Sequence, residues 1–259
     1  MEKVRAKKSL GQHFLTDEGI ARRIVDSLAW GDGTSCQQQV LEVGPGMGVL
    51  TKYLLEDKSV NLCAVEVDQE SVAYLHEHFP SLRVVAADFL KIDLSTLFES
   101  RYALIGNFPY NISSQILFRV FDNRDIIPVV VGMFQKEVAE RVAAAPGNKS
   151  YGILSVLLTA YYDIEYLFTV EQQVFNPPPK VKSAVIRLRR NGVTHLDCNE
   201  KLFIKVVKAG FGQRRKTMRN ALRTLGLSLE NIPANMLAMR AEQLGVDDFV
   251  SITKILQLQ

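Results

Sequence analysis

Three short segments of this chain carry residue types at spacings that could do chemistry. The first, residues 40–51, reads VLEVGPGMGVLT, and Gly44, Gly46 and Gly48 follow its apolar run. Glycines at this spacing let the backbone turn sharply and approach a ligand closely. The dinucleotide fingerprint G-x-G-x-x-G fails, because the sixth position counted from Gly44 is Val49. The turn therefore favours an adenosyl cofactor without a pyrophosphate over a nicotinamide dinucleotide.

Two acidic residues end the next two apolar runs. Glu66 comes 22 residues after Gly44, where an acidic side chain can accept hydrogen bonds from both ribose hydroxyls. Asp88 would then lie against an adenine amine, and Phe89 beside the adenine ring. Each residue alone has an ordinary explanation: a surface charge for Glu66 and a helix cap for Asp88. Their order along the chain and their positions at strand ends favour a nucleoside site.

The third segment, residues 106–113, reads GNFPYNIS. An adenine N6 amine is a poor nucleophile because its lone pair is delocalised into the ring, so an enzyme must hold it nearer to tetrahedral geometry. The side-chain carbonyl of Asn107 and the backbone carbonyl next to Pro109 could accept the two amine hydrogens, while Tyr110 stacks on an extruded base. No general base is required, since the product can release its proton to water and positioning supplies the catalysis. A simple strand-ending turn is the structural alternative.

Short apolar runs alternating with helical patterns surround these segments. The expected strands are Val40–Val43, Leu62–Val67, Arg83–Ala87, Ala103–Gly106, Val129–Phe134 and, after three prolines, Val181–Leu188. A helix over Asp17–Ala29, with Asp17 favouring its N-terminus, precedes the first strand. Strands separated by helical patterns predict an α/β fold with a parallel sheet.

Beyond Asn191 the pattern becomes helical and basic. Residues 180–259 hold 15 Lys and Arg against 6 Asp and Glu, whereas the rest of the chain holds 16 against 22. We therefore expect a catalytic domain over residues 1–190 and a helical domain over residues 191–259. Arg215, Arg219 and Arg223 are spaced i, i+4 and i+8, which predicts a cationic stripe on one helix that could contact phosphates. A solvated helix face is the structural alternative.

Composition excludes several other classes of protein. The chain is 47% hydrophobic and 23% charged, as in ordinary globular proteins. No apolar run approaches the roughly 18 residues of a membrane span, and the basic start is unlike a signal peptide. The three cysteines, Cys36, Cys63 and Cys198, lack C-x-x-C spacing and predict neither a disulfide framework nor a zinc site. We expect a cytoplasmic protein that binds no metal and does not associate with a membrane.

Several colinear segments resemble one known family. The glycine turn, Glu66 and Asp88 are similar to motifs I to III of class I methyltransferases. The remaining similar segments are KKSLGQHFL (residues 7–15), QKEVAER (135–141), SYGILS (150–155), VFNPPPKVKSAV (174–185) and FGQRRKTMRNAL (211–222). With the Asn-x-Pro-Tyr segment, they make almost the whole chain resemble the KsgA-type ribosomal RNA adenine dimethyltransferases.

This resemblance implies a Rossmann-like class I methyltransferase sheet flanked by helices, with a small all-helical C-terminal domain. It implies S-adenosyl-L-methionine as methyl donor and two adjacent adenosines near the 3′ end of small-subunit ribosomal RNA as substrate, each receiving two methyl groups. The implied partner is a pre-30S-type particle, and we expect a monomer. The implied cofactor-binding residues are His13, Leu15, Gly44, Gly46, Glu66, Asp88, Phe89 and Asn107, and the implied RNA-binding residues are Arg214, Arg215, Lys216, Arg219 and Arg223.

Two residues depart from the commonest pattern of the family. His13 stands where Asn is usual and Phe108 where Leu is usual, so His13 could contact the cofactor through its side chain or only through its backbone. The nearest alternative is the related antibiotic-resistance methyltransferase that acts on large-subunit ribosomal RNA. A second is a non-catalytic assembly factor or transcription-factor relative that keeps the fold. An assembly checkpoint that acts by binding is compatible with catalysis and stands as an additional hypothesis.

Overall fold

The computed structural model describes residues 4–28 and 38–258. Contacts divide the chain into two compact units: the chain up to Ala139 with Glu165–Arg189, and Glu140–Ile164 with the chain from Arg190 onward. Residues 140–164, which a single cut near 190 would leave in the first domain, thus belong to the second unit.

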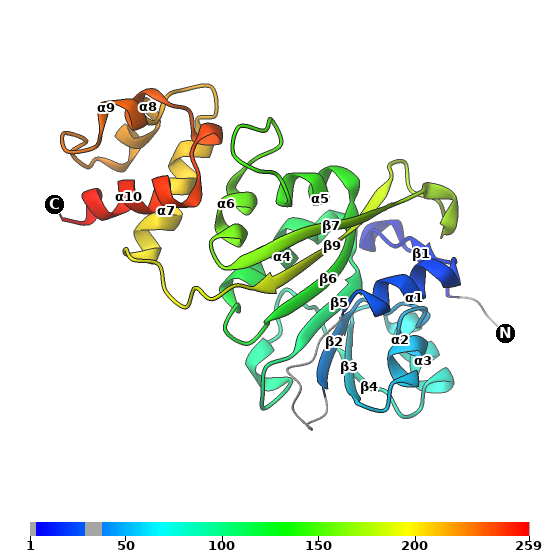
Figure 1. The fold of residues 1–259 in the computed structure, drawn as a ribbon. Helices are drawn as coiled ribbons and strands as arrows, with labels where there is room; N and C mark the ends of the chain where they lie inside the picture. Colours follow the sequence, from blue (N-terminus) through cyan, green and yellow to red (C-terminus); the bar gives the residue numbers. More distant parts are fainter. Residues whose placement is uncertain (1–3, 29–37, 259) are drawn as a thin grey trace. The chain divides into compact units, whose positions relative to one another are not determined.

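The first unit is built on a seven-stranded sheet flanked by helices (Figure 1). In spatial order, the strands are β4 (Arg83–Ala86), β3 (Val60–Glu66), β2 (Gln38–Val43), β5 (Ala103–Asn107), β6 (Val129–Gln135), β9 (Ser183–Arg190) and β7 (Tyr162–Val170). The order reverses at β2, whose neighbours are β3 and β5, and open α/β sheets bind ligands at the carboxyl ends of strands at such a switch point.

Strand directions bear out most of the expected sheet and correct one part of it. All six expected strands are present, and β4, β3, β2, β5 and β6 pair in parallel. The expectation of a parallel sheet is wrong for β9, which pairs antiparallel with β6 from Val129↔Arg189 to Gln135↔Ser183. β7 was not expected, since this edge strand is largely solvent-accessible and lacks the apolar run of the central strands.

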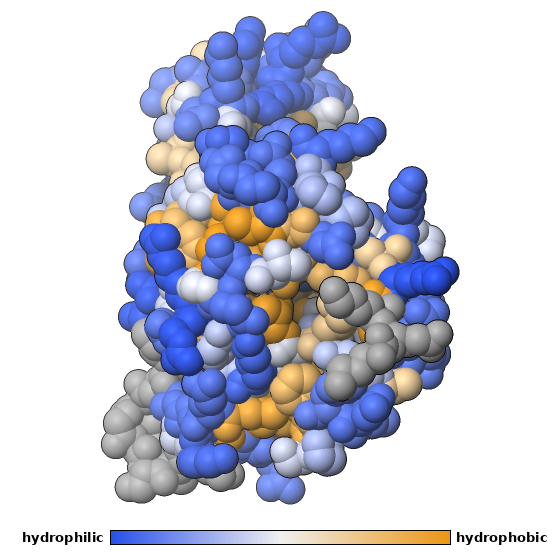
Figure 2. All heavy atoms as spheres, turned by 90° about the vertical axis from the view of Figure 1, so that its right-hand side faces the viewer, coloured by the Kyte–Doolittle hydropathy of each residue, from blue (hydrophilic) through white to orange (hydrophobic). Residues whose placement is uncertain are grey.

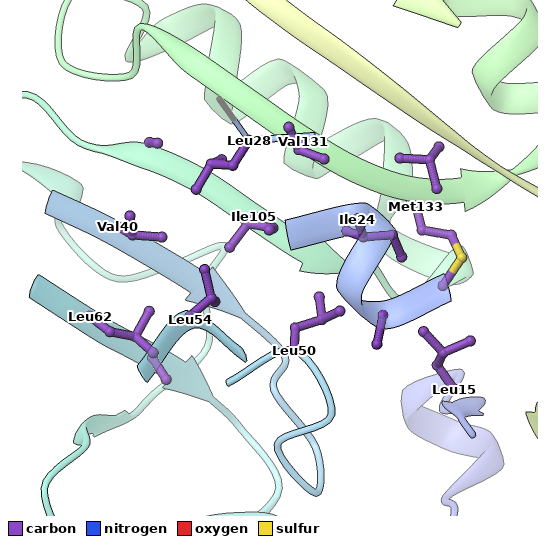
Figure 3. Close-up of a cluster of buried hydrophobic side chains, with 14 of the residues drawn as sticks. Leu15, Ile24, Leu28, Val40, Leu50, Leu54, Leu62, Ile105, Val131 and Met133 are labelled. Carbon is purple, nitrogen blue, oxygen red and sulfur yellow. The ribbon is translucent and has the colours of Figure 1, made fainter. Parts of the chain in front are cut away.

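Helices cover the sheet by burying apolar stripes. α1 (Glu18–Asp26) begins as expected at Asp17, whose side chain accepts a hydrogen bond from the Ile20 N–H at 2.9 Å; residue 29 of the predicted helix lies outside the described residues. α2 (Thr51–Glu56) and α3 (Gln69–His78) follow β2 and β3. Figure 3 shows Ile24 of α1 and Leu54 of α2 directed towards strand residues such as Ile105, and all three are fully or almost fully buried.

Two further parts of the first unit adjoin the residues that line the pocket described below. A single turn of 3-10 helix at Tyr110–Ile112 connects β5 to α4 (Ser113–Asp122). The N-terminal segment runs into β1 (Phe14–Leu15), which pairs antiparallel with β8 (Phe175–Asn176). This pairing ties the first described residues to the chain that follows β7.

The second unit is helical and has its own core. Its helices are α6 (Ile153–Thr159), α7 (Glu200–Gly212), α8 (Met218–Leu222), α9 (Ala234–Ala238) and α10 (Val246–Gln257); α5 (Lys136–Val142) leads into it. α7 packs against α6, α8 and α10, and buries Phe203, Val206 and Val207 completely. α10 likewise buries Phe249, Ile252 and Leu256, so the two helices together supply much of the core of this unit.

Polar side chains dominate the face of the molecule drawn in Figure 2, and hydrophobic residues there form separate areas between them. Across residues 4–28 and 38–258, no helix is both long and apolar enough to cross a membrane.

Candidate active site

A pocket opens at the carboxyl ends of β2, β3 and β5, where the three segments singled out above meet. Its lining includes the glycine turn after β2, Glu66 at the end of β3, Asp88 after β4, and Asn107 to Ile112 after β5. The N-terminal segment from Leu10 to Leu15 supplies another wall. Because five separate parts of the first unit converge here, the pocket is the candidate active site.

Glycine is required in the turn after β2 for two reasons: the backbone conformation there and, at Gly46, the close approach of Phe14. Gly44 and Gly46 have φ of 67° and 58°, in the left-handed region that favours glycine. A Cβ on Gly46 would come within 2.8 Å of the Phe14 ring, whereas one on Gly44 would meet nothing closer than 3.9 Å. Gly46 thus leaves room for the N-terminal segment to close against the turn, a reason beyond ligand approach alone.

The Glu66 carboxylate is fixed by backbone N–H groups. Oε2 accepts a hydrogen bond from Gly46 at 3.2 Å, and Oε1 accepts from Val67 and Asp68, both at 2.8 Å. The residue is only 5% exposed, and this burial raises the pKa of Glu66 while the three N–H groups oppose the rise. A carboxylate can accept about four hydrogen bonds. Glu66 can therefore still accept one from a ligand hydroxyl.

Glu42 is a second carboxyl group in the pocket, and the sequence analysis did not select it. It is 1% exposed, and its Oε2 accepts a hydrogen bond from the Thr51 hydroxyl at 2.6 Å. Burial raises the pKa of Glu42 to about 7, and the nearby charge of Glu66 adds to the rise. A lone carboxyl within the apolar run VLEV just before the glycine turn was the available signal.

Asp88 lines the pocket, but Phe89 does not. The Asp88 Oδ1 accepts a hydrogen bond from the Leu90 N–H at 2.9 Å, so the residue caps its own turn as well as facing the pocket. Phe89 is 3% exposed and lies outside the pocket lining, with the Arg119 guanidinium 5.7 Å from its ring centre. Val67 and Leu90 supply the apolar wall that was expected from Phe89.

Asn107 has an orientation set by the N-terminal segment. Its side-chain Nδ2 donates a hydrogen bond to the His13 backbone carbonyl at 2.9 Å. Turning the amide over would bring two carbonyl oxygens together, so Oδ1 is the atom directed away from His13. Pro109 has its carbonyl occupied within its own turn, because it accepts hydrogen bonds from Ile112 N and Ser113 Oγ, both at 3.2 Å.

Two contacts hold the Tyr110 side chain, one through its hydroxyl and one through its ring. Its hydroxyl hydrogen-bonds the hydroxyl of Ser183, which is fully buried at the start of β9. Its ring stacks on the His13 ring, with centroids 5.4 Å apart and planes 29° apart. Burial raises the pKa of Tyr110. The His13 ring also contacts the Pro177 carbonyl through Nδ1 at 2.7 Å, so in this structure its side chain faces Tyr110 and Pro177.

Asp68 anchors the N-terminal segment, whose residues 10–15 line the pocket. This carboxylate, whose side chain is 1% exposed, pairs with the Lys7 ammonium and accepts a hydrogen bond from Gln12 Nε2 at 3.2 Å. Lys7 also pairs with Glu70 at 3.0 Å. These bonds lower the pKa of Asp68 although its burial opposes them. They bring Leu15, predicted from the resemblance, to the pocket wall.

The basic residues singled out in the C-terminal part lie in the second unit, and the predicted helical stripe is wrong. Arg215 precedes α8 and Arg223 follows it in a 3-10 turn, so only Arg219 of the three lies on an α-helix. The helix restarts at Met218 because Thr217 is extended, bridges Arg240, and lets the Met218 N–H bond the Met239 carbonyl at 2.7 Å. The exposed side chains are Arg214, Arg215, Lys216, Arg219 and Arg223.

Among the residues that the structure describes, no group of three or more His, Cys, Asp or Glu side chains could hold a metal ion. Cys63 and Cys198 are free thiols, and Cys36 lies outside the described residues. The reactive features of the pocket are therefore two buried carboxyl groups, an oriented amide and an anchored tyrosine.

Comparison with known proteins agrees with this geometry. Residues 3–258 match the family described as Ribosomal RNA adenine dimethylase. A relative from Cytophaga hutchinsonii named "Ribosomal RNA small subunit methyltransferase A" is 58% identical over 99% of both chains. A protein of the same name from Parabacteroides distasonis is 55% identical over 99% of this chain and 96% of its own.

Solved structures show the same architecture. The dimethyladenosine transferase from Plasmodium falciparum superposes with a TM-score of 0.75 at 26% identity, covering 93% of this chain and 96% of the other. The 23S rRNA methyltransferase ErmE gives a TM-score of 0.69 at 24% identity, covering 93% and 99%, which supports the shared fold. The fold is that of class I methyltransferases, and the chain belongs to the ribosomal RNA adenine dimethylase family.

Proposed function

We propose that this chain transfers methyl groups from S-adenosylmethionine to the N6 atoms of two adjacent adenosines in a hairpin loop near the 3′ end of small-subunit ribosomal RNA. The observation that carries the proposal is the Asn107 amide, which His13 orients so that Oδ1 remains to accept a hydrogen bond from an amine. It stands in the same pocket as the carboxylate of Glu66.

The residues of the pocket fit S-adenosylmethionine. Glu66 would accept a hydrogen bond from a ribose hydroxyl and Asp88 one from the adenine amine, while Val67 and Leu90 offer apolar surface to the purine ring. Gly44 adds no side chain to the pocket. His13 and Leu15 would contribute from the N-terminal segment. When bound, S-adenosylmethionine supplies a methyl carbon attached to a positively charged sulfur, which an amine can attack.

The target amine would be held by two acceptors. Asn107 Oδ1 is one; since the Pro109 carbonyl is already bonded, the carbonyl of Phe108, which forms the peptide bond to Pro109, is the second. Tyr110, whose hydroxyl is fixed by Ser183, would stack on the extruded base. The two acceptors would draw the N–H bonds out of the ring plane, so that the nitrogen lone pair could bond to the methyl carbon as its bond to sulfur breaks. The sulfur would leave uncharged, and the methylated nitrogen, then positively charged, would release its proton to water. Positioning supplies the rate enhancement.

The basic residues of the second unit would bind RNA phosphates. Arg214, Arg215, Lys216, Arg219 and Arg223 are exposed, and none of them pairs with an acidic side chain within the described structure. Phosphate contacts give affinity and register rather than sequence choice. In this proposal the first unit binds the methyl donor and the base, and the second unit contacts RNA.

The shared name of the relatives supports a small-subunit target, whereas the likeness to the 23S enzyme supports the fold alone. A pre-30S-type particle as substrate, a monomer and a cytoplasmic location complete the proposal. An assembly checkpoint by binding is an additional function that the same surfaces could serve.

Labelled methyl transfer to immature subunits tests the target. Small subunits that lack the modification should accept methyl groups from labelled S-adenosylmethionine, and large subunits should not. Digestion to nucleosides should yield N6,N6-dimethyladenosine. Transfer to large-subunit RNA, or a labelled product other than an N6-methylated adenosine, would contradict the proposed function.

A further inference from the structure

Arg119 joins the loop after β4 to helix α4. Its Nη1 donates a hydrogen bond to the Leu90 carbonyl at 2.7 Å, and its Nη2 donates one to the Ile92 carbonyl at 2.6 Å. The guanidinium also lies 5.7 Å from the centre of the Phe89 ring. Two backbone carbonyls and one ring of a single short loop are thus engaged by one side chain.

The loop that Arg119 holds is the one that carries Asp88 and Leu90 to the pocket. Residues 87–93 form neither helix nor strand, and their internal bonds close only a local turn, from the Lys91 and Ile92 N–H groups to the Asp88 carbonyl at 2.9 and 3.1 Å. That turn fixes its own shape, and a hydrogen bond from the Ala87 N–H to the Glu66 carbonyl at 2.9 Å ties only the start of the loop to β3. The part of the loop at Leu90 and Ile92 needs a further restraint towards the rest of the site. The two bonds from Arg119 supply such a restraint.

Arg119 is itself carried by the element that positions the other half of the site. α4 begins at Ser113, whose hydroxyl bonds the Pro109 carbonyl at 3.2 Å, and it follows Asn107 to Ile112 without a break. A movement of α4 would therefore be transmitted both to the Asn-x-Pro-Tyr loop and, through Arg119, to Asp88.

The chemistry of the contact favours arginine specifically. A guanidinium presents several N–H donors in a rigid fork, whereas a lysine ammonium is a point charge on a flexible stem. The half-buried Arg119 also leaves its buried Nε without a hydrogen-bond partner. An unpaired buried donor is unfavourable, so the favourable polar contacts of this guanidinium come from its two terminal nitrogens.

We propose that Arg119 is a positioning residue for methyl transfer, which sets the place of Asp88 relative to Asn107 by clamping the Leu90 and Ile92 carbonyls. The inference rests on the proposed function, because it assigns Asp88 to the methyl donor and Asn107 to the target amine. Arg119 acts through the loop and touches neither substrate.

The test compares the affinity for S-adenosylmethionine of Arg119→Gln with that of a control variant on β4, the strand that precedes this loop. Arg83, at the opposite end of β4, also donates one hydrogen bond to a backbone carbonyl, that of Leu97 at 2.7 Å, but it lies outside the pocket lining. Arg119→Gln should raise the Kd for S-adenosylmethionine, measured by calorimetry on the full chain, about tenfold, whereas Arg83→Gln should leave it within about twofold. Arg119→Lys should give an intermediate Kd, and it replaces Arg119→Gln if that variant does not fold.

A double-mutant cycle separates positioning from general stability. If Arg119 acts through Asp88, Arg119→Gln should cost little further affinity once Asp88→Asn is present, although it costs the wild-type background about tenfold. Equal Kd values for wild type and the Arg119 variants, equal effects of the Arg83 and Arg119 variants, or fully additive effects with Asp88→Asn would each overturn the inference. Wild-type protein that bound no S-adenosylmethionine would instead refute the proposed function itself.

Discussion

Glu42 is a carboxyl group buried at the pocket with a pKa raised to about 7, against an ordinary value of 4.5. The folded state therefore keeps its proton in a pH range where the unfolded chain has released it. Stability contributed by the protonated form is fully present below about pH 4.5 and is lost as the pH rises towards 7. The shift corresponds to about 3 kcal/mol in the free energy of unfolding.

Glu42→Gln removes this titration and keeps an acceptor for the Thr51 hydroxyl. We predict that denaturant unfolding of the wild type shows a free energy that falls between pH 5 and 7, and that the variant loses most of this fall. Glu77→Gln, on the exposed side of α3, is the control and should follow the wild type. Parallel pH profiles for wild type and Glu42→Gln would show that Glu42 ionises normally.

Residue types and spacing were enough to select Gly44, Glu66, Asp88, Asn107 and Tyr110, all of which line one pocket. Their partners could not be selected in this way. Phe14 against Gly46 and Ser183 on Tyr110 lie 32 and 73 residues away in the chain, and no local pattern connects such pairs. Phe89 was placed in the pocket by its position next to Asp88, but its apolar ring packs inside the protein instead.

At the scale of elements, Phe108 occupies a socket that two strands leave open. A Cβ on Gly132 of β6 would lie 2.3 Å from the Phe108 ring, and one on Gly106 of β5 would lie 2.8 Å from it. The ring also packs on Phe134, with centroids 4.9 Å apart. The two glycines explain how this chain accommodates an aromatic ring directly between Asn107 and Pro109.

Gly132→Ala should therefore displace the Phe108 ring, destabilise the protein by about 1 to 3 kcal/mol and lower methyl transfer. Phe108→Leu should restore part of both losses, because the shorter side chain leaves room for the new methyl group. Unfolding and activity of the two single variants and the double variant form the necessary cycle. Strictly additive losses would mean that the socket does not couple these residues.

Periodicity identified the buried strands but not the edge of the sheet. β6 is almost continuously apolar, and so are the buried parts of β2 and β3 apart from their acidic residues, because both faces of the sheet are covered there. β7 is largely accessible and has no such signal, and the direction of β9 depends on how the chain returns after β8. The cationic stripe failed for a similar reason, since the pairing of Thr217 with Arg240 interrupts the helix.

At the scale of the whole molecule, the proposal gives the two units different roles: the first binds the methyl donor and the target base, and the second contacts RNA phosphates. Replacing Arg215 and Arg219 by Gln should weaken RNA binding and lower the slope of log affinity against log salt by about 1.4 to 1.8, since each lost phosphate contact removes about 0.7 to 0.9. Filter binding to unmodified small-subunit RNA across a salt series measures both quantities.

Lys201→Gln with Lys205→Gln is the matched control, because these exposed residues on α7 carry the same total charge and lie outside residues 214–223, which hold the proposed phosphate contacts. The control pair should change the affinity for RNA. It should change the slope of log affinity against log salt only by the amount that the loss of net charge causes, which is less than the change for Arg215 and Arg219. Identical slopes for the two pairs would assign the salt dependence to overall charge and not to Arg215 and Arg219.

The central claim is that one pocket holds a methyl donor and orients an adenine amine through Asn107. The most direct measurement pairs calorimetry with labelled transfer for wild type and Asn107→Ala on unmodified small subunits. Wild type should bind S-adenosylmethionine and form N6,N6-dimethyladenosine, whereas Asn107→Ala should transfer methyl groups about 10²-fold more slowly. A variant that methylates at the wild-type rate, or a wild type that takes up no donor, would contradict the account.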